Sequence, residues 1–206
     1  MDSQLVHWLD IVAVAMLAVS GGLTAARHRL DIFGFAVIAT VTGLGGGTTR
    51  DLLLGIRPVL WIGDPLYVEV CVGVGAAMFF AAPRVARGER ALLWADALGL
   101  AMFSVLGAQR ALNHDAPAAI AVVMGTMTAV FGGMLRDVFC AEAPLILRKE
   151  IYATAAVIGA GGFVALVRLG VAPDIAGLIG FAAALLVRGA AITYGWSLPS
   201  HRGLEP

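Results

Sequence analysis

Two short segments of this sequence combine consecutive glycines with an adjacent arginine and aspartate. They are GGTTRD at residues 46–51 and GGMLRD at residues 132–137, each inside a long apolar stretch. An ionised residue at the centre of a lipid-exposed helix costs about 2.5–3.5 kcal/mol, so such charges must face protein or water. They could set the electric field along a path through a membrane. Alternatively, they could join helices near the span ends, where long side chains reach the interface.

The order of the charges suggests how they pair. Arg50 precedes Asp51, and Arg136 precedes Asp137. Adjacent residues on a helix point in different directions, so we do not expect each arginine to bind its own neighbour. The hypothesis is a crossed arrangement, in which Arg50 binds Asp137 and Arg136 binds Asp51.

Glycines precede both charged pairs. Gly45, Gly46 and Gly47 are consecutive, and Gly132 and Gly133 occupy the matching place in the second segment. Each glycine in a helix interior costs about 0.5–1 kcal/mol relative to alanine. We therefore predict a kink or break at the triplet, lining a permeation path. Close helix packing, which small residues permit, is the alternative.

Threonine hydroxyls lie beside these glycines, at Thr48, Thr49 and Thr128. Hydroxyls and freed backbone carbonyls are suitable ligands for a weakly held monovalent cation. The sequence therefore predicts that they line the same path. The alternative is that each threonine donates its proton to a carbonyl of its own helix.

The elements that carry these residues are predicted to be membrane-spanning helices. The chain has 206 residues, of which 60% are hydrophobic and 14% charged, and its mean hydropathy is +0.89. Soluble domains are about half apolar and about a quarter charged, whereas a span needs about 20 apolar residues. We predict an all-α integral membrane protein with seven spans, at residues 5–26, 31–55, 64–83, 90–111, 115–140, 148–169 and 173–195.

The sequence also repeats itself. Asp96 lies 86 positions after Asp10, Pro144 lies 86 positions after Pro58, and the same offset joins the two glycine–arginine–aspartate segments. Because each unit has an odd number of spans, the second enters the membrane from the opposite side, as in inverted-repeat transport proteins. The predicted domains are a three-helix repeat at 5–83, an inverted three-helix repeat at 90–169, a seventh helix at 173–195 and a cytoplasmic tail at 196–206.

Asp10 and Asp96 lie near the starts of the first and fourth spans. An acidic residue in the first turn interacts favourably with the helix dipole. We therefore expect both to cap their helices at the interface. A mouth residue that attracts cations is the alternative.

Basic residues predict the orientation. One side of the membrane carries nine of them, against three on the other, and cytoplasmic loops are richer in lysine and arginine. We therefore expect the N-terminus outside and the C-terminus in the cytoplasm. Two of the nine, Arg148 and Lys149, could bind anionic lipid headgroups. The nine are Arg27, Arg29, Arg84, Arg87, Arg90, Arg148, Lys149, Arg188 and Arg202, and the three are Arg57, Arg110 and Arg168.

No pattern in the sequence indicates an enzyme. It has no histidine, cysteine and carboxylate cluster with metal-ligand spacing, no paired nucleophile and base, and no phosphate-binding loop. Its net charge is zero, so no basic stripe suggests nucleic acid. We expect no catalysis, no cofactor and no bound metal.

The doubled motif resembles that of a known family. GGGTTRD at 45–51, GGMLRD at 132–137 and a seventh span are similar to the prokaryotic members of the trimeric intracellular cation (TRIC) channels, also labelled glycine-transporter-like. The resemblance covers about residues 8–195. It implies a homotrimer in which each seven-helix protomer has its own pore, lined by the kinked second and fifth spans and permeable to potassium and, less selectively, sodium. It assigns the glycines to the kinks and the arginines and aspartates to the charged positions that follow.

These features together predict a monovalent cation channel of the bacterial inner membrane, surrounded by lipid. Two other functions fit the same residues. A secondary transporter of a small amino acid such as glycine would use an arginine to bind the substrate carboxylate. A scaffold without transport would show a tightly packed midplane.

Overall fold

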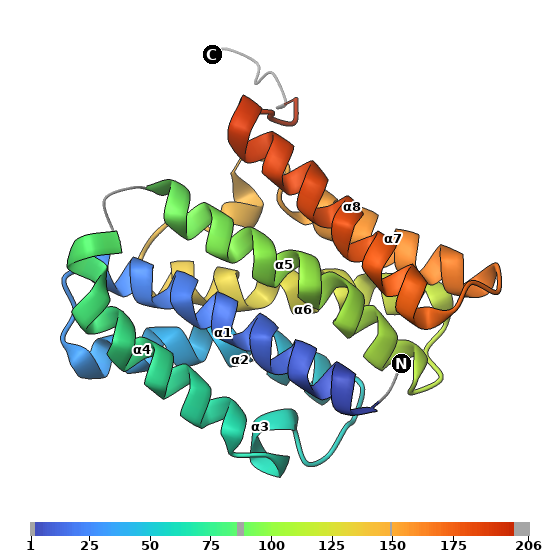
Figure 1. Ribbon diagram of the computed structural model, residues 1–206, viewed down its shortest axis with the longest axis horizontal. Helices are drawn as coiled ribbons and strands as arrows, with labels where there is room; N and C mark the ends of the chain where they lie inside the picture. Colours follow the sequence, from blue (N-terminus) through green and yellow to red (C-terminus); the bar gives the residue numbers. More distant parts are fainter. Residues whose placement is uncertain (1–2, 86–88, 149, 200–206) are drawn as a thin grey trace, which may run out of the picture.

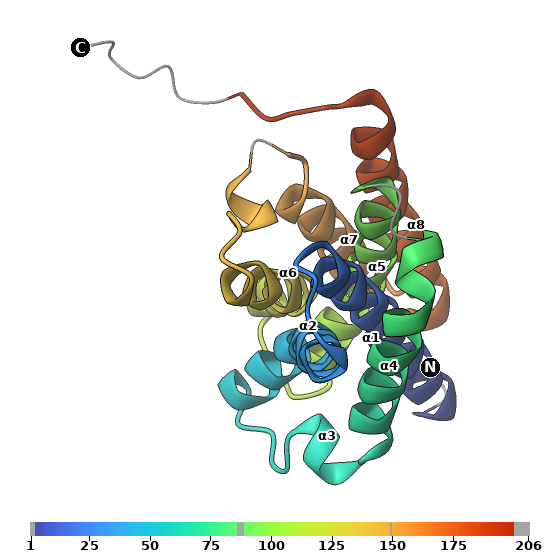
Figure 2. The same ribbon diagram turned by 90° about the vertical axis from the view of Figure 1, so that its left-hand side faces the viewer.

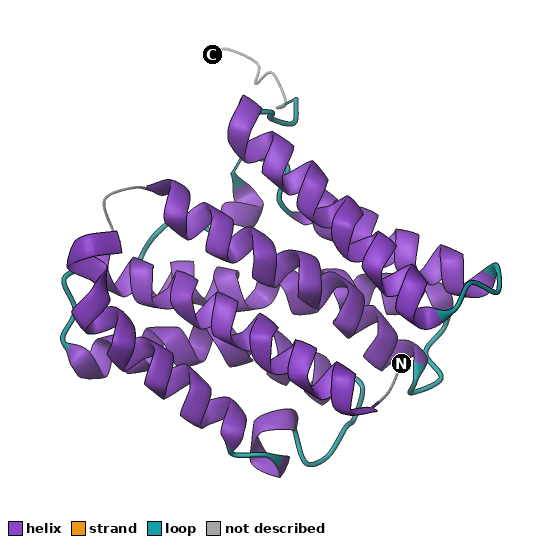
Figure 3. Ribbon diagram, viewed as in Figure 1, coloured by secondary structure: helices purple, strands orange, loops and turns teal. Residues whose placement is uncertain are grey.

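Seven long helices make up most of the structure, a computed structural model that describes residues 3–85, 89–148 and 150–199 (Figure 3). The all-α membrane fold is confirmed. The largest difference at a helix end is at α7, which begins at Ala153 and not at residue 148. The long helices are α1 (Ser3–Arg27), α2 (Ile32–Leu53), α4 (Leu66–Val85), α5 (Glu89–Leu112), α6 (Ala118–Phe139), α7 (Ala153–Arg168) and α8 (Pro173–Tyr194).

Two short helices lie between the long ones. They are α3 (Leu60–Gly63) and the 3₁₀ turn η1 (Leu145–Leu147). Neither was predicted, because a single turn is too short to show a hydrophobic period. Each follows one of the charged segments: α3 comes after α2, and η1 comes after α6. The first residue of each short helix contacts the charged segment before it, as described below for the site.

Five of the helices are long and apolar enough to cross a membrane: α1, α2, α5, α6 and α8. The apolar parts of α4 and α7, Leu66–Ala81 and Ala153–Arg168, are shorter. The 16 residues of α7 extend over about 24 Å, whereas the hydrocarbon core of a bilayer is about 30 Å thick.

The helices form one bundle in which α1 and α5 lie side by side across the middle (Figure 1). On one side α4 packs against α1 and α2, and on the other α7 and α8 pack against each other and against α5. Figure 2 shows α2 and α6 as neighbours, and Figure 1 shows that they run in opposite directions. The two glycine segments therefore lie on antiparallel helices in contact.

Glycines set the distance between neighbouring helices. A Cβ atom at Gly21 would stand 2.7 Å from Thr42 Oγ1, and one at Gly107 would stand 2.6 Å from Thr128 Oγ1. Gly107 lies 86 positions after Gly21, which is the offset of the repeat. The same close contact thus occurs twice, once between α1 and α2 and once between α5 and α6.

Candidate functional site

The two glycine segments meet where α2 crosses α6. A Cβ atom at Gly46 would overlap the carbonyl oxygen of Thr128, and a Cβ atom at Gly132 would overlap that of Thr42. Backbone therefore touches backbone at the crossing, and neither position accepts a side chain larger than hydrogen. Main chain, not side chains, closes the space between the two helices.

Neither helix is broken at its glycines. α2 is continuous from Ile32 to Leu53, through Gly45, Gly46 and Gly47, and α6 is continuous through Gly132 and Gly133. The predicted break is wrong for this conformation, because the close approach of the two backbones accounts for the absence of a side chain at Gly46 and Gly132, whereas a kink that leaves the helix continuous stays a prediction. The alternative of close packing describes Gly46 and Gly132, whereas a Cβ atom at Gly47 would meet no atom of the described residues closer than 3.9 Å.

The threonine hydroxyls bond within their own helices. Thr48 also accepts a hydrogen bond from Trp61 Nε1 at 3.1 Å. The protons are used by carbonyls one turn earlier, so only oxygen lone pairs remain for an ion, and the predicted ligand role stays a prediction. The bonds run from Thr48 Oγ1 to Leu44 O at 2.7 Å, from Thr49 Oγ1 to Gly45 O at 2.9 Å and from Thr128 Oγ1 to Met124 O at 2.6 Å.

Each arginine binds the aspartate that follows it. Arg50 Nε donates to Asp51 Oδ1 at 2.9 Å, and Arg136 Nε donates to Asp137 Oδ1 at 2.8 Å. The predicted crossed pairs are wrong, because antiparallel α2 and α6 place their charged segments at opposite ends of the crossing. Both arginines are 1% exposed, so their side chains are enclosed by protein.

The chain that returns after each helix explains these neighbour pairs. Asp51 Oδ2 accepts the backbone N–H of Leu60 at 2.9 Å, and Asp137 Oδ2 accepts that of Leu145 at 2.9 Å. Leu60 begins α3 and Leu145 begins η1. These bonds hold each carboxylate where the long arginine side chain can reach it. We call the two places the Arg50 end and the Arg136 end.

At the Arg136 end the guanidinium binds a second carboxylate. Arg136 Nη1 donates to Asp96 Oδ1 at 2.7 Å and to Ser20 Oγ, and Ser20 Oγ donates to Asp96 Oδ1 at 3.3 Å. Asp96 is fully buried inside α5, so its predicted capping role is wrong. Ser20 belongs to α1, so the contact connects α1, α5 and α6.

Arg188, expected only to mark the cytoplasmic side, is a second buried arginine near this end. Its Nη2 donates to Glu150 Oε2 at 2.7 Å and its Nη1 to the carbonyl of Ile151 at 3.1 Å. The guanidinium also lies 5.1 Å from the ring centre of Tyr152, as in a cation–π contact. These contacts attach α8 to the segment before α7.

At the Arg50 end the corresponding carboxylate is less engaged. Asp10 is 6% exposed and lies inside α1, so it does not cap the helix as predicted. Tyr67 Oη donates to Asp10 Oδ2 at 3.4 Å and lies 3.4 Å from His7 Nδ1. Asp10 Oδ1 has no hydrogen-bond partner in the described part of the chain.

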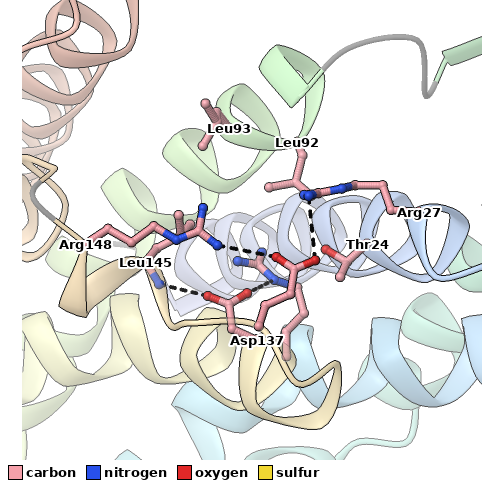
Figure 4. Close-up of a pocket in the computed structure, with 9 residues that line it drawn as sticks. Thr24, Arg27, Leu92, Leu93, Asp137, Leu145 and Arg148 are labelled. Atoms are coloured by element: carbon pink, nitrogen blue, oxygen red, sulfur yellow. Dashed lines mark hydrogen bonds and ion pairs between the residues drawn. The ribbon is translucent and has the colours of Figure 1, made fainter.

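A cluster of charges covers the Arg136 end. Glu142 Oε1 lies 2.9 Å from His28 Nε2 and 3.6 Å from Arg27 Nη2, and its Oε2 lies 3.4 Å from Arg148 Nη2. Figure 4 shows Arg148 and Arg27 reaching in from opposite sides, with Asp137 beneath. The cavity between them has a volume of about 10 Å³, which is space for about one water molecule. A hydrated ion does not fit inside it.

Arg148, one of the two residues predicted to bind lipid, has partners within the protein. Arg148 already donates to the carbonyl of Ala143 at 3.1 Å and to Glu142, and one third of its side chain is exposed. Lys149 lies outside the described residues. Lipid binding at these positions stays a prediction.

Acidification is expected to weaken the Glu142 cluster. Burial raises the pKa of Glu142, but the hydrogen bond from His28 and the charges of Arg27 and Arg148 outweigh it, so the pKa lies below the usual 4.5. A carboxylate whose pKa is lower in the folded state adds stability above the unfolded pKa, and loses it as the pH falls through the folded pKa. The stability that Glu142 gives over Glu142→Gln, at most about 1 kcal/mol, should therefore shrink below about pH 4.5.

Thermal unfolding of the detergent-solubilised protein across this range measures the effect. Glu69→Gln is the control, because Glu69 is exposed on α4 and forms no ion pair among the described residues. A stability difference for Glu142→Gln that does not change with pH would contradict the prediction.

Some residues of the site gave no signal in the sequence. Ser20 and Glu142 have no polar counterpart 86 positions away, and Trp61 and Tyr152 resemble ordinary interfacial aromatics. Asp96 did give a signal, because it is the repeat counterpart of Asp10. Two acidic residues at equivalent places inside apolar helices indicate that both belong with the charged segments.

Comparison with known proteins shows which protein family the sequence matches. The family model described as Glycine transporter matches residues 7–83 and 93–168. The chain is 42% identical over 201 residues to the UPF0126 inner membrane protein YadS of Escherichia coli K12. The aligned region covers 96% of this chain and 96% of YadS.

Solved structures of cation channels share the whole fold. A TRIC trimeric intracellular cation channel orthologue from Rhodobacter sphaeroides superposes with a TM-score of 0.91 and 47% identity, over 94% of this chain and 100% of that one. A second TRIC cation channel, studied for its conductance, superposes with a TM-score of 0.89 and 31% identity, over 100% of both chains.

Proposed function

The chain belongs to the prokaryotic TRIC channel family, and on this premise we propose that it forms a homotrimeric cation channel with one potassium-permeable pore in each protomer. The pore follows the α2–α6 crossing from the Arg50 end to the Arg136 end. The pore is also permeable to sodium, with less selectivity. The similarity to YadS supports a place in the bacterial inner membrane.

The observation that carries this proposal is that carboxylates neutralise both arginines beside the crossing. An unpaired guanidinium would repel a passing cation. Arg50 Nη2 lies 2.8 Å from Asp51, and Arg136 lies 2.8 Å from Asp137 and 2.7 Å from Asp96. These side chains therefore add no net positive charge to the path, which makes it suitable for cations.

The closed crossing corresponds to a non-conducting conformation in this proposal. Backbone contact at Gly46 and Gly132 closes the midplane, which on its own would also suit a scaffold without transport. Two features favour a channel: the neutralised arginines and the family of cation channels to which the chain belongs. Separation of α2 from α6 would expose the carbonyls of Thr42 and Thr128, and carbonyl oxygens are ligands for potassium.

We further propose that the protomer consists of two inverted units, residues 5–83 and 90–169, followed by a seventh helix at 173–195 and a cytoplasmic tail at 196–206. The N-terminus lies outside, so the Arg136 end faces the cytoplasm. The constant sequence offset supports this division. So does the recurrence of the same contact in both units, from Asp51 to Leu60 and from Asp137 to Leu145.

A secondary transporter of a small amino acid such as glycine is the second candidate, because the matching family model is described as Glycine transporter. Arg50 or Arg136 would then exchange an aspartate for the substrate carboxylate. Domain-scale transitions take microseconds to milliseconds or longer, so alternating access would stay below roughly 10⁴ turnovers per second where each step takes about 0.1 ms. Ion currents well above that rate distinguish a channel.

Recording in a planar bilayer tests the proposal. With asymmetric KCl we expect discrete openings that reverse near the potassium equilibrium potential. Asp51→Asn should lower the conductance about tenfold or more, because it leaves Arg50 without its counter-charge and each 1.4 kcal/mol of barrier slows passage about tenfold. Arg50→Ala should also change the conductance, which would place both residues on the path.

Asp31→Asn is the matched control. Asp31 is exposed and caps α2 by accepting the backbone N–H of Gly34 at 2.7 Å, and asparagine caps a helix equally well. We expect its conductance to equal that of the unmodified protein. A silent bilayer together with glycine uptake into vesicles would contradict the channel and support the transporter.

A further inference from the structure

The two ends of the α2–α6 crossing are built alike. At each end the arginine Nε donates to the next aspartate, whose second oxygen accepts a backbone N–H. The third carboxylate, Asp96 at one end and Asp10 at the other, has the same place in the sequence repeat. A difference between the two ends can therefore be interpreted as two states of the same arrangement of one arginine and two carboxylates.

The two ends differ in the contact to this third carboxylate. Arg136 Nη1 lies 2.7 Å from Asp96 Oδ1. Arg50 and Asp10 are both described, and the structure records no ion pair and no hydrogen bond between them. Asp10 Oδ1 and Arg50 Nη2 are buried without hydrogen-bond partners, although Nη2 lies 2.8 Å from Asp51 Oδ1. A buried carboxylate oxygen without a hydrogen-bond partner thus lies at the same end as a guanidinium nitrogen whose recorded contact is the ion pair with Asp51, and at the Arg136 end the second oxygen of Asp96 also lacks a partner among the described residues.

The space beside each arginine differs in the same sense. A Cβ atom at Gly133 would stand 2.9 Å from Tyr152 Oη, 3.3 Å from Asp96 Oδ1 and 3.4 Å from Arg136 Nη2. At Gly47, which occupies the equivalent position, the nearest such atom is 3.9 Å away. The Arg136 end is therefore packed more tightly beside its glycine than the Arg50 end, where a Cβ atom at Gly47 would be in ordinary van der Waals contact with Arg50 Nη2.

We propose that Arg50 and Asp10 form a second ion pair, which closes the Arg50 end of the pore in another conformation of the protein. In the conformation described, Asp96 holds Arg136 and Asp10 is released from Arg50. Asp10 is then a positioning residue that acts on Arg50, as Asp96 acts on Arg136. This inference rests on the proposed function, and it gives the pore one closure at each end.

Closed-time distributions from single-channel recordings test the inference. We expect two closed components, one from each ion pair. Asp10→Asn should shorten one component about fivefold or more, the usual size of coupling between interacting groups. Asp96→Asn should shorten the other. The unitary conductance should stay closer to the original value in Asp10→Asn than in Asp51→Asn, because Asp51 still neutralises Arg50.

A double-mutant cycle separates a specific pair from a general structural role. Arg50→Gln should shorten the same closed component as Asp10→Asn, and the double variant should equal either single variant. Asp10→Glu retains the carboxylate and should restore the component. Arg110→Gln is the control for the rival partner, because Arg110 also interacts electrostatically with Asp10. Additive effects, or a closed component that only Arg110→Gln removes, would overturn the Arg50–Asp10 pair.

A cross-linking measurement does not depend on current. In a protein whose Cys71 and Cys140 are replaced by alanine, Asp10→Cys and Arg50→Cys should be joined by a short bifunctional thiol reagent. The same reagent should not join Asp10→Cys to Asp137→Cys, at the opposite end. Cross-linking without any current would retain the pair and refute the channel. Current without cross-linking and without an effect of Asp10→Asn would refute the pair alone.

Discussion

Replacement of Gly46 by alanine is expected to lower the free energy of unfolding by about 1–3 kcal/mol, the usual cost of overpacking. The new Cβ atom would overlap the carbonyl oxygen of Thr128, which is main chain and can move only if α2 and α6 separate. The better helix propensity of alanine, about 0.5–1 kcal/mol, recovers only part of this cost. Gly132→Ala should have a similar effect, through Thr42. Loss of the folded protein's gel-filtration peak on heating measures both.

Gly73→Ala on α4 is the matched control for these variants. Within the described part of the chain, no atom outside its own helix turn lies within 4 Å of a Cβ atom placed at Gly73. It should therefore keep only the gain in helix propensity and melt at the same or a slightly higher temperature. Equal melting temperatures for Gly46→Ala, Gly132→Ala and Gly73→Ala would show that the α2–α6 crossing is not closed by backbone contact.

Arg136→Gln is expected to cost more, about 3–5 kcal/mol, because removal of one partner from a buried ion pair leaves an uncompensated buried charge. In this case two carboxylates, Asp96 and Asp137, would lose their shared cation inside the protein. Arg50→Gln should cost less, because among the described residues Arg50 forms an ion pair with Asp51 only. Thermal unfolding of the three proteins in the same detergent ranks these effects.

Arg148→Gln is the matched control for Arg136→Gln, because the side chain of Arg148 is partly exposed. Arg148 lies 3.4 Å from Glu142 with one third of its side chain exposed, and pairs of this kind contribute about 0–1 kcal/mol. Arg148→Gln should therefore be nearly neutral. The explanation from buried charge is wrong if Arg136→Gln and Arg148→Gln unfold at the same temperature. Arg136→Lys should recover only part of the loss, because lysine lacks the planar fork that donates to two carboxylates at once.

The positions of the seven long helices followed from the sequence. Within a bilayer an apolar segment of about 20 residues satisfies its backbone only as a helix, so hydropathy alone locates it. The largest error was at α7. There the chain first forms η1, so that Leu145 can donate to Asp137, and the helix begins only at Ala153. That turn serves a contact with another helix, which hydropathy does not record.

Contacts between helices, which the sequence pattern does not record, also limited how much of the site could be predicted. From the sequence alone it followed that arginines and aspartates lie at repeat-related places inside apolar helices, and that they must face protein or water. It could not determine the partners. Arg50 binds Asp51, and not Asp137, because the chain after α2 returns at Leu60 and fixes the carboxylate, while the antiparallel crossing places Asp137 at the other end.

The role of the glycines was also decided by the tertiary structure. The sequence showed that Gly46 and Gly132 are equivalent, but a glycine without a side chain fits a kink and a close contact equally well. Only the approach of α2 to α6 shows that each faces a carbonyl of the opposite helix. Sequence periodicity and offset describe one chain along its length, whereas contacts between helices depend on their crossing and on the turns between them.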